Sequence, residues 1–356
     1  MAQPTLFYGG PPGTTYGWGI CNRHLIAELS QLTPVVSLTD QHPDWHNPSL
    51  PGDLFTPLGN HEFLPVTPAR GRRNFAYTFF EAEPNRQSSE RAKRYDAIFA
   101  GSTWCVERLR AHGIPHGIVL VQGVDGKIFA PRPRPPADGK FRLFSGGKFE
   151  LRKGQDLVLR AFRALHKKYP DLHLVTAWFN HWPQTMALVA RAPDVKFELI
   201  PGSWTEQMEH VYRLNDIDPR RETTLPLLPQ AQMADVYAQS DLGLFPNRCE
   251  GGTNLVLMEY LACGRPAIAT FGTGHRDVVH KKNSLLLRNL RPLVIHGAHR
   301  EVAARWVEPT VDEIIAQIEH AYHHRTETAV LAHQAAADLQ HWSWPRAAKT
   351  ILAHLT

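Results

Sequence analysis

The sequence predicts an α/β protein made of two consecutive Rossmann-like domains, each built on a parallel β-sheet. Three observations predict this fold. A short apolar strand, a glycine-rich loop and a helix open the chain, which is how a nucleotide-binding α/β domain starts. The same alternation of strands and helices restarts after a proline-rich segment at residues 130–140. The chain has 356 residues, more than one compact core usually organises.

The composition is that of a folded enzyme with a mild positive balance. Hydrophobic residues make up 43% of the chain, aromatic residues 10% and charged residues 21%, which excludes global disorder. There are 39 Lys and Arg against 34 Asp and Glu, a formal charge of +5. That surplus suits an anionic ligand or a weak contact with a membrane surface. It is too small for a protein that coats nucleic acid.

Features that report on compartment favour a cytoplasmic protein. The first residues show no basic flank and no apolar core of signal-peptide length. No stretch reaches the roughly 18 to 20 apolar residues of a membrane span. The cysteines lie far apart without a CxxC pair, so we expect reduced thiols; they are Cys21, Cys105, Cys249 and Cys263. We expect a cytoplasmic location, with peripheral contact at the inner face of the membrane left open.

Twenty histidines raise the question of a metal site. His320, His323 and His324 could share a helical face, but no HExxH or Cys/His array accompanies them. We expect a solvated, histidine-rich helix surface there. The sequence predicts no metal ion and no cofactor.

The first domain is predicted from its apolar runs and the loops between them. Residues 5–8 form a short strand, residues 9–19 a loop rich in Gly and Pro, and residues 21–29 a helix. Residues 41–68 are a long proline-rich segment, and such segments in compact domains are usually functional or mobile. Further strands are expected at residues 34–38, 74–79, 97–100 and 118–121.

The domain boundary is predicted at residues 130–140, APRPRPPADGK, where proline stiffens the chain and little can be buried. We predict an N-terminal domain at residues 1–135 and a C-terminal domain at residues 136–339. Strands of the second domain are expected at residues 141–144, 172–177, 195–200, 242–245 and 267–270. Helices are expected at residues 155–168, 233–239, 255–263, 310–324 and 344–355.

The most informative segment is residues 245–265, FPNRCEGGTNLVLMEYLACGR. A strand ends at its start, Thr253 or Asn254 is a good helix N-cap, and Gly264 is placed to end the helix. Glu250 and Glu259 are nine residues apart, so on one continuous helix they would point in opposite directions. They converge on one ligand only if Glu250 stays in the loop. Glu259 can then accept hydrogen bonds from two vicinal hydroxyls, as on a ribose. The alternative to ligand binding is that one acid has a structural role and the other lies on the helix surface.

Backbone groups at the start of that helix can hold an anion. Glycines before a helix N-terminus leave free N–H groups that, with the helix dipole, face a negative charge. The candidate anion-contacting residues of this loop are Gly251, Gly252, Thr253, Asn254 and Leu255.

Two further loops carry weaker signals. In residues 144–156, FSGGKFELRKGQD, Lys148 and Lys153 flank a short loop between a strand and a helix. Cations at the C-terminal end of a parallel strand lie where open α/β sheets bind ligands, so the two lysines could clamp a diphosphate. Two solvated lysines are the alternative. The opening loop GTTYGWG permits close backbone approach at Gly17, Trp18 and Gly19, but it lacks a full GxGxxG and a Walker A lysine.

Together these three segments resemble the retaining glycosyltransferases of family 4 (GT4), whose GT-B architecture has two Rossmann-like domains facing an interdomain cleft. GKFELRKGQD is similar to that family's donor-phosphate loop, with Lys148 where arginine is usual and Lys153 at the family lysine. CEGGTNLVLMEYLACG is similar to its two-acid segment, although eight residues separate the acids where the family has seven. The resemblance implies that Glu250 contacts the donor sugar and Glu259 the nucleotide ribose.

The resemblance also implies a reaction. A retaining, metal-independent hexosyltransferase would move a sugar from a UDP- or GDP-sugar to a hydroxyl acceptor, in the synthesis of a glycan, a polysaccharide or a glycolipid. Lys148, Lys153 and the N–H groups of residues 17–19 and 253–255 would stabilise the leaving diphosphate, which in that family receives the acceptor's proton. Leu228 lies in the stretch that would read the base. A last helix at residues 340–356 would pack back on the first domain.

The acceptor side is predicted at residues 77–86, YTFFEAEPNR, where a strand ending in aromatics runs into two acids. Glu81 is our choice for orienting the acceptor hydroxyl, although many relatives place a histidine in this region. The alternative is that Glu81 is a loop acid on the protein surface with no role toward the acceptor.

Other functions stay open from the sequence. A GT-B-fold sugar-nucleotide epimerase or phosphorylase would keep the fold and change the chemistry. A non-enzymatic sugar- or polyanion-binding protein would use the positive balance alone. No nucleic-acid partner is expected.

Overall fold

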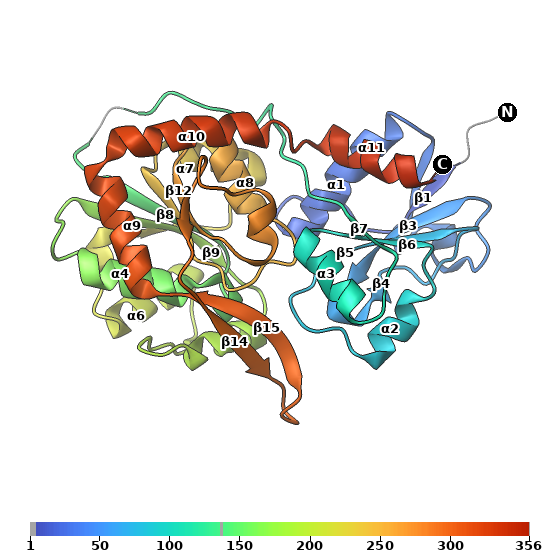
Figure 1. The fold of residues 1–356 in the computed structure, drawn as a ribbon, viewed down its shortest axis with the longest axis horizontal. Coiled ribbons are helices and arrows are strands. Elements are labelled where there is room, and N and C mark those ends of the chain that lie inside the picture. The colour runs from blue at the N-terminus through green and yellow to red at the C-terminus, as the bar shows by residue number, and fades with distance from the viewer. Residues whose placement is uncertain (1–4, 136–137, 356) are drawn as a thin grey trace.

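The protein was analysed as a computed structural model, which describes residues 5–135 and 138–355. The chain folds into two α/β lobes that lie side by side (Figure 1). We call residues 5–120 with 343–355 the first lobe and residues 141–339 the second lobe. Each lobe is centred on its own sheet, and both sheets run parallel except at one short edge strand of the first.

The first lobe carries a sheet of order β2-β1-β3-β5-β6-β7, with the short β4 antiparallel to β3. Its core is aromatic, and Phe55, Tyr77 and Phe99 are all buried within it. The strands are β1 (Leu6–Tyr8), β2 (Val35–Ser37), β3 (Asp53–Gly59), β4 (Leu64–Pro65), β5 (Asn74–Thr78), β6 (Ala97–Ala100) and β7 (Gly117–Val119). The helices are α1 (Gly17–Ser30), α2 (Arg86–Ala92) and α3 (Thr103–Ala111).

The second lobe carries a parallel sheet of order β10-β9-β8-β11-β12-β13. Its strands are β8 (Phe141–Lys148), β9 (Leu172–Phe179), β10 (Glu222–Thr224), β11 (Leu242–Phe245), β12 (Ala267–Thr270) and β13 (Leu285–Leu287). Its helices are α4 (Gln155–Leu165), α5 (Pro183–Met186), α6 (Trp204–Leu214), α7 (Gln230–Ala238), α8 (Leu255–Ala262), α9 (Val311–His323) and α10 (Arg325–Leu339). The strand order of each sheet matches a doubly wound parallel fold, as predicted.

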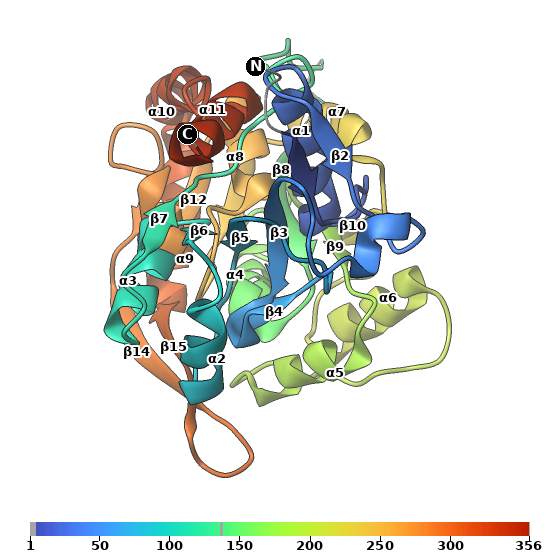
Figure 2. The same cartoon turned by 90° about the vertical axis from the view of Figure 1, so that its right-hand side faces the viewer.

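The chain crosses between the lobes twice, and the two crossings touch. Val124 N–H donates to the Trp342 carbonyl at 2.8 Å. A Cβ on Gly123 would lie 2.2 Å from the Trp344 backbone nitrogen, so only glycine allows this approach. After the second crossing, α11 (Trp344–Leu355) packs against α1 of the first lobe, with Trp344 and Ile351 buried (Figures 1 and 2). The predicted limits at residues 135 and 339 stay predictions.

Several predicted elements differ from the observed ones. The helix expected at residues 21–29 begins at Gly17, because Tyr16 is extended and its carbonyl accepts from Ile20 N–H. The strand expected at residues 195–200 is wrong. There, the Asn215 side chain bonds both the N–H and the carbonyl of Lys196, which supplies the partners a strand would have supplied. The segment at residues 41–68, expected to be a long proline-rich loop, contains β3, which lies inside the first sheet, and β4. Short 3₁₀ segments, the strands β10 and β13 and the helices α2, α3, α5, α6 and α10 were also not predicted.

An antiparallel hairpin, β14 (Leu290–His296) with β15 (Val302–Pro309), was also not predicted. It projects from the lower side of the second lobe in Figure 1. Exposed and half-buried residues alternate along β14, which is typical of a strand with one solvent face.

Candidate functional site

The candidate site is built where strands of the second lobe end and the first lobe approaches. β8 ends at Lys148, and the turn η3 (Leu151–Lys153) leads through Gly154 into α4. Gly154 has φ 73°, and a Cβ there would lie 2.2 Å from the Pro246 carbonyl oxygen. β11 ends at Phe245, and residues 246–254, which we call the acid loop, lead into α8. The two loops that the sequence singled out therefore lie against each other.

Glu250 is buried in this loop and holds a cluster of donors. Lys153 Nζ lies 2.6 Å from its carboxylate and Arg152 Nη1 lies 3.2 Å away. The Asn247 side-chain amide also donates to it. Burial alone would raise the pKa of Glu250, but the charges of Lys153 and Arg152 lower it to about 2. Glu250 is thus an ionised acid at neutral pH, and Lys153 is paired with it.

Arg152 is the residue that sequence reasoning missed. It lies 2.7 Å from Glu150, 3.3 Å from Glu81 of the first lobe and 3.2 Å from Glu250. Burial would lower its pKa, but these three carboxylates raise it above the ordinary arginine value. The sequence signal was its place directly before Lys153. Its bridging role depends on a residue 71 positions away, which no local pattern indicates.

Lys148 does not share a partner with Lys153. Its ammonium lies 3.2 Å from Glu150 and 4.5 Å from the centre of the Trp182 ring. Trp182 is half exposed beside it, whereas Trp178 on the preceding strand is buried and donates to Ser145. The two lysines therefore flank the loop as predicted, and each ammonium contacts other side chains of the protein.

Glu259 is buried on α8, and among the residues that the structure describes no cation contacts it directly. Gln230 Nε2 donates to it at 2.5 Å and the Tyr237 hydroxyl at 3.3 Å. Burial raises its pKa to about 8. Gln230 also accepts from Arg23 of the first lobe at 2.7 Å, so a hydrogen-bonded chain runs from α1 to Glu259. Leu228 lies just before this chain and is partly buried.

The acid loop packs against the first lobe through its glycines. A Cβ on Gly251 would lie 2.5 Å from the Phe80 carbonyl oxygen, and one on Gly252 would lie 2.9 Å from the Phe79 ring. Ser102 donates to the Gly251 carbonyl at 2.7 Å. These glycines, predicted to face an anion, thus form part of the contact between the lobes.

The start of α8 is capped as the sequence predicts. Asn254 has φ 63° and its side-chain oxygen accepts from Leu257 N–H at 3.5 Å. The first backbone bond of the helix runs from Met258 N–H to the Asn254 carbonyl, so the N–H groups of Leu255 and Val256 precede the helical ladder. The Thr253 hydroxyl is buried against the Met258 sulfur.

Gly17, Trp18 and Gly19 form the first turn of α1 and not an open loop. The Trp18 ring lies 4.4 Å, centre to centre, from the tilted ring of Phe79, which follows the strand leading to Glu81. A Cβ on Gly19 would lie 2.8 Å from the Gly13 Cα. The free N–H groups of this turn are those of a helix N-terminus, the kind of site that binds anions.

Glu81 lies on the first lobe and faces the acid loop. Its carboxylate is 3.3 Å from Arg152 and accepts from Gly251 N–H at 3.4 Å. The neighbouring acid Glu83 is held by His112 at 2.6 Å and Arg108 at 3.4 Å. The structure therefore brings Glu81 to the other predicted residues and turns Glu83 toward its own lobe.

The other basic and histidine-rich features lie outside this site. Arg73 pairs with Asp53 and Lys93 with Glu90 on the first lobe. His320, His324 and Glu327 each offer one ligand atom, all within 4.8 Å of one another, and the last two are exposed. That no metal is needed stays a prediction.

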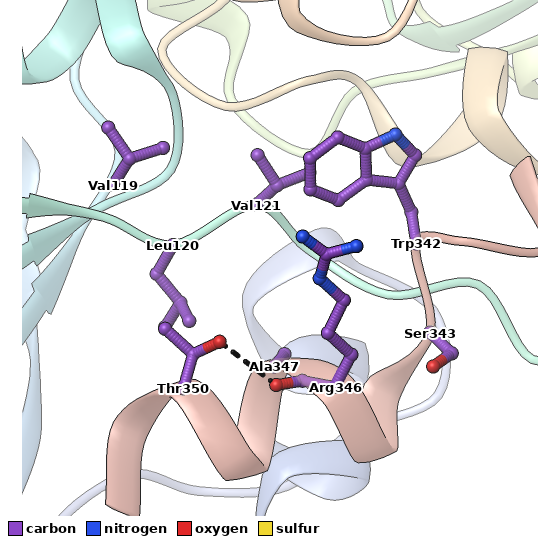
Figure 3. Close-up of a pocket in the computed structure, with 8 residues that line it drawn as sticks. All are labelled: Val119, Leu120, Val121, Trp342, Ser343, Arg346, Ala347 and Thr350. Carbon is purple, nitrogen blue, oxygen red and sulfur yellow. Dashed lines mark hydrogen bonds between the residues drawn. The ribbon is translucent and has the colours of Figure 1, made fainter. Parts of the chain in front are cut away.

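A cavity of about 220 Å³ lies between the first crossing and α11 (Figure 3). Val121, Trp342 and Arg346 are among its lining residues, and the Arg346 guanidinium lies 4.8 Å from the Trp342 ring centre. Its lining contains none of the residues predicted for the site. The site described above is instead closed by the contact between the lobes.

Comparison with known families identifies part of the second lobe. Residues 182–298 match the family described as Glycosyl transferases group 1. The D-inositol 3-phosphate glycosyltransferase of Thermobispora bispora is 28% identical over 180 residues. That match covers 47% of this chain and only 38% of that protein. Residues 182–298 are therefore similar to the group 1 glycosyltransferases, and the chain spans less than half the length of the relative that it matches.

Solved structures share the whole fold. A sucrose-phosphate synthase from Thermosynechococcus elongatus superimposes with a TM-score of 0.69 at 13% identity, covering 98% of this chain and 97% of that chain. Anabaena HepE, solved with UDP and glucose, superimposes with a TM-score of 0.65 at 15% identity, covering 99% of both chains. The GT-B fold and the resemblance to GT4-like glycosyltransferases are confirmed. Within the described ranges, no helix combines the length and apolar character that a membrane crossing requires.

Proposed function

We propose that this protein is a retaining glycosyltransferase that moves a sugar from a UDP- or GDP-sugar to a hydroxyl acceptor without a metal ion. The observation that carries the proposal is the cluster of Glu250, Lys153 and Arg152 at the lobe boundary, with Glu81 opposite. The group 1 match over residues 182–298 and the likeness to HepE, which was solved with UDP and glucose, support it.

Lys153 and Lys148 are proposed to neutralise the leaving diphosphate. Cleavage of the sugar–phosphate bond places negative charge on that group, so fixed cations and backbone N–H groups lower the barrier. The N-termini of α1 and α8 supply N–H groups from Gly17 to Gly19 and from Leu255 and Val256. For Lys153 to bind phosphate, its contact with Glu250 must lengthen or be shared.

Glu259 is proposed to bind the ribose of the donor. Its carboxyl accepts two hydrogen bonds from protein groups in the present structure, from Gln230 and Tyr237. Two ribose hydroxyls present the same kind of donors and can replace these bonds. Leu228, two residues before Gln230, is proposed to lie against the base.

Glu250 and Glu81 are proposed to act on the two sugars. Glu250 is ionised, and it is proposed to accept hydrogen bonds from donor-sugar hydroxyls while its charge favours a cationic transition state. Glu81 is proposed to orient the acceptor hydroxyl. Retention follows if the acceptor attacks from the face that the phosphate leaves, with the phosphate receiving the proton. The acceptor is a hydroxyl-bearing glycan, lipid-linked sugar or small molecule, and work at a cytoplasmic membrane face is part of the proposal.

Thermal unfolding with nucleotides tests this proposal. In buffer containing EDTA, UDP- or GDP-sugars should raise the melting temperature, and Glu259→Gln should remove most of that shift. If no nucleoside diphosphate or nucleotide sugar changes the melting temperature, the proposal is wrong. NMR of the donor without acceptor separates the remaining chemistry, because an epimerase would convert the nucleotide sugar with the nucleotide still attached.

A further inference from the structure

β15 of the hairpin joins the two lobes next to the candidate site. Trp306 Nε1 donates to the Glu81 carbonyl at 2.7 Å. Glu83 N–H donates to the Ala303 carbonyl at 2.8 Å. Arg305 adds a longer ionic contact of 4.0 Å to Glu83. The segment that carries the predicted acceptor acid is therefore held by a strand of the other lobe.

The same strand also holds the acid loop. Val307 N–H donates to the Arg248 carbonyl at 3.1 Å. Glu308 pairs with the Arg248 guanidinium at 2.5 Å. That guanidinium is almost fully buried and binds both carboxylate oxygens of Asp156 at 2.6 Å. Arg248 stands two residues before Glu250, so β15 is anchored to the rigid base of the loop that carries this acid.

These contacts fix the two acids through adjacent residues of one strand. Trp306 bonds the backbone of Glu81 and Val307 bonds the backbone of Arg248, so one residue step of β15 spans the two acid-bearing segments. Arg152, described above, contacts both acids directly through its side chain. The Trp306 bond comes from a side chain that packs against the core of the second lobe, whereas the bonds of Ala303 and Val307 come from the strand backbone.

We propose that β15 positions Glu81 relative to Glu250, with Trp306 as a positioning residue for the acceptor. This inference rests on the proposed function. β15 lies beyond residues 182–298, the segment that matches the group 1 family, so the family match does not supply it. Loss of the Trp306 N–H should leave donor binding intact and misplace the acceptor hydroxyl, because that bond holds only the segment carrying Glu81.

The test compares Trp306→Phe with Val294→Thr. Phenylalanine keeps an aromatic side chain that packs against the core and removes the donor. Val294 is exposed on the neighbouring strand β14 and serves as the matched control. Hydrogen exchange by mass spectrometry is measured over residues 79–86 in both variants and in the original protein. Trp306→Phe should raise exchange there by about tenfold, as expected from the loss of one hydrogen bond, and Val294→Thr should leave it unchanged.

Kinetics then test the role. Trp306→Phe should raise the acceptor KM or lower kcat by about tenfold. Its affinity for the nucleotide should be unchanged. Hydrolysis of the donor should increase relative to sugar transfer. Unchanged exchange over residues 79–86, or equal loss of nucleotide affinity and transfer, would overturn the positioning role. If the original protein transfers no sugar, the proposed function fails, and the exchange measurement still decides whether β15 holds the Glu81 segment.

Discussion

Arg152 of the second lobe lies 3.3 Å from Glu81 of the first. Both side chains are largely buried, and the same guanidinium also contacts Glu250. The pair links the predicted acceptor acid to the predicted donor acid across the lobe boundary. The contact between the lobes therefore brings the two acids to one cation.

The Arg152–Glu81 contact should be measurable as a coupling energy. Arg152→Met leaves three carboxylates without their shared cation and should lower the unfolding free energy by about 3 kcal/mol or more. Glu81→Gln removes one of those charges, so the double variant should lose less than the sum of the single variants. Urea unfolding of the four proteins gives the cycle. Strict additivity would show that the two side chains do not interact.

Lys153→Ala should lower the rate of sugar transfer by about 100-fold or more, because it removes a fixed cation from the developing phosphate charge. Lys127→Ala is the control, since Lys127 is exposed on the segment between the lobes. Lys153→Ala also removes a charge that keeps the Glu250 pKa at about 2. The acid limb of its pH–rate profile should therefore shift to higher pH. Equal rates for the two alanine variants would remove Lys153 from the mechanism.

Glu259→Gln should change stability in a pH-dependent way. The folded protein holds the Glu259 proton up to about pH 8, whereas an unfolded chain releases it near its ordinary value of 4.5. The contribution of the Glu259 proton to the free energy of unfolding is therefore complete below pH 4.5, and it is lost as the pH rises through 8. Between pH 4.5 and 8, the unfolding free energy of Glu259→Gln should rise relative to that of the original protein by up to about 1.4 kcal/mol per pH unit. Denaturant unfolding at pH 5, 7 and 9 measures this difference.

The matched control for that experiment is Glu198→Gln, whose side chain is 68% exposed. Glu222, with a pKa of about 7, titrates in both variants and cancels in the comparison. If the difference in unfolding free energy between Glu259→Gln and the original protein does not grow with pH, the Glu259 carboxyl ionises normally.

Gly251→Ala should open the lobes and abolish transfer. A Cβ there would lie 2.5 Å from the Phe80 carbonyl oxygen, closer than real Cβ atoms come, and the opposing group is backbone. Gly126→Ala places a Cβ in open space and should have no effect on either property. Small-angle X-ray scattering should show a larger radius of gyration for Gly251→Ala alone. An unchanged radius with full activity would mean that the lobes need not meet at this loop.

Local sequence was sufficient to predict the acid loop and the helix that follows it. Asn254 caps α8, Gly264 adopts φ 68° after it, and Glu250 stays in the loop, as the residue types required. Glu259 sits on the helix, as the spacing indicated. These features depend on neighbours in sequence, and propensity and spacing report on such neighbours.

Contacts between lobes could not be predicted in this way. Arg23 with Gln230 and Trp306 with Glu81 are separated by 207 and 225 residues. No periodicity encodes such pairs, because they depend on how two folded lobes meet. The first turn of α1 was missed for a different reason, since Gly17 and Gly19 have low helix propensity and tertiary packing overrides it. The hairpin could not be predicted from apolar and polar alternation, because β14 reads LRPLVIH and its solvent face appears only in the structure.

NMR of UDP- and GDP-sugars incubated with the protein in EDTA shows whether the acid loop and Lys153 handle a nucleotide sugar with retention and without metal. We expect release of the nucleoside diphosphate and, as the first product, a sugar or glycoside with the donor's own anomeric configuration. Lys153→Ala should be strongly impaired in this reaction. A first product of inverted configuration, or no turnover of any donor unless a divalent cation is added, would show that the proposed chemistry is wrong.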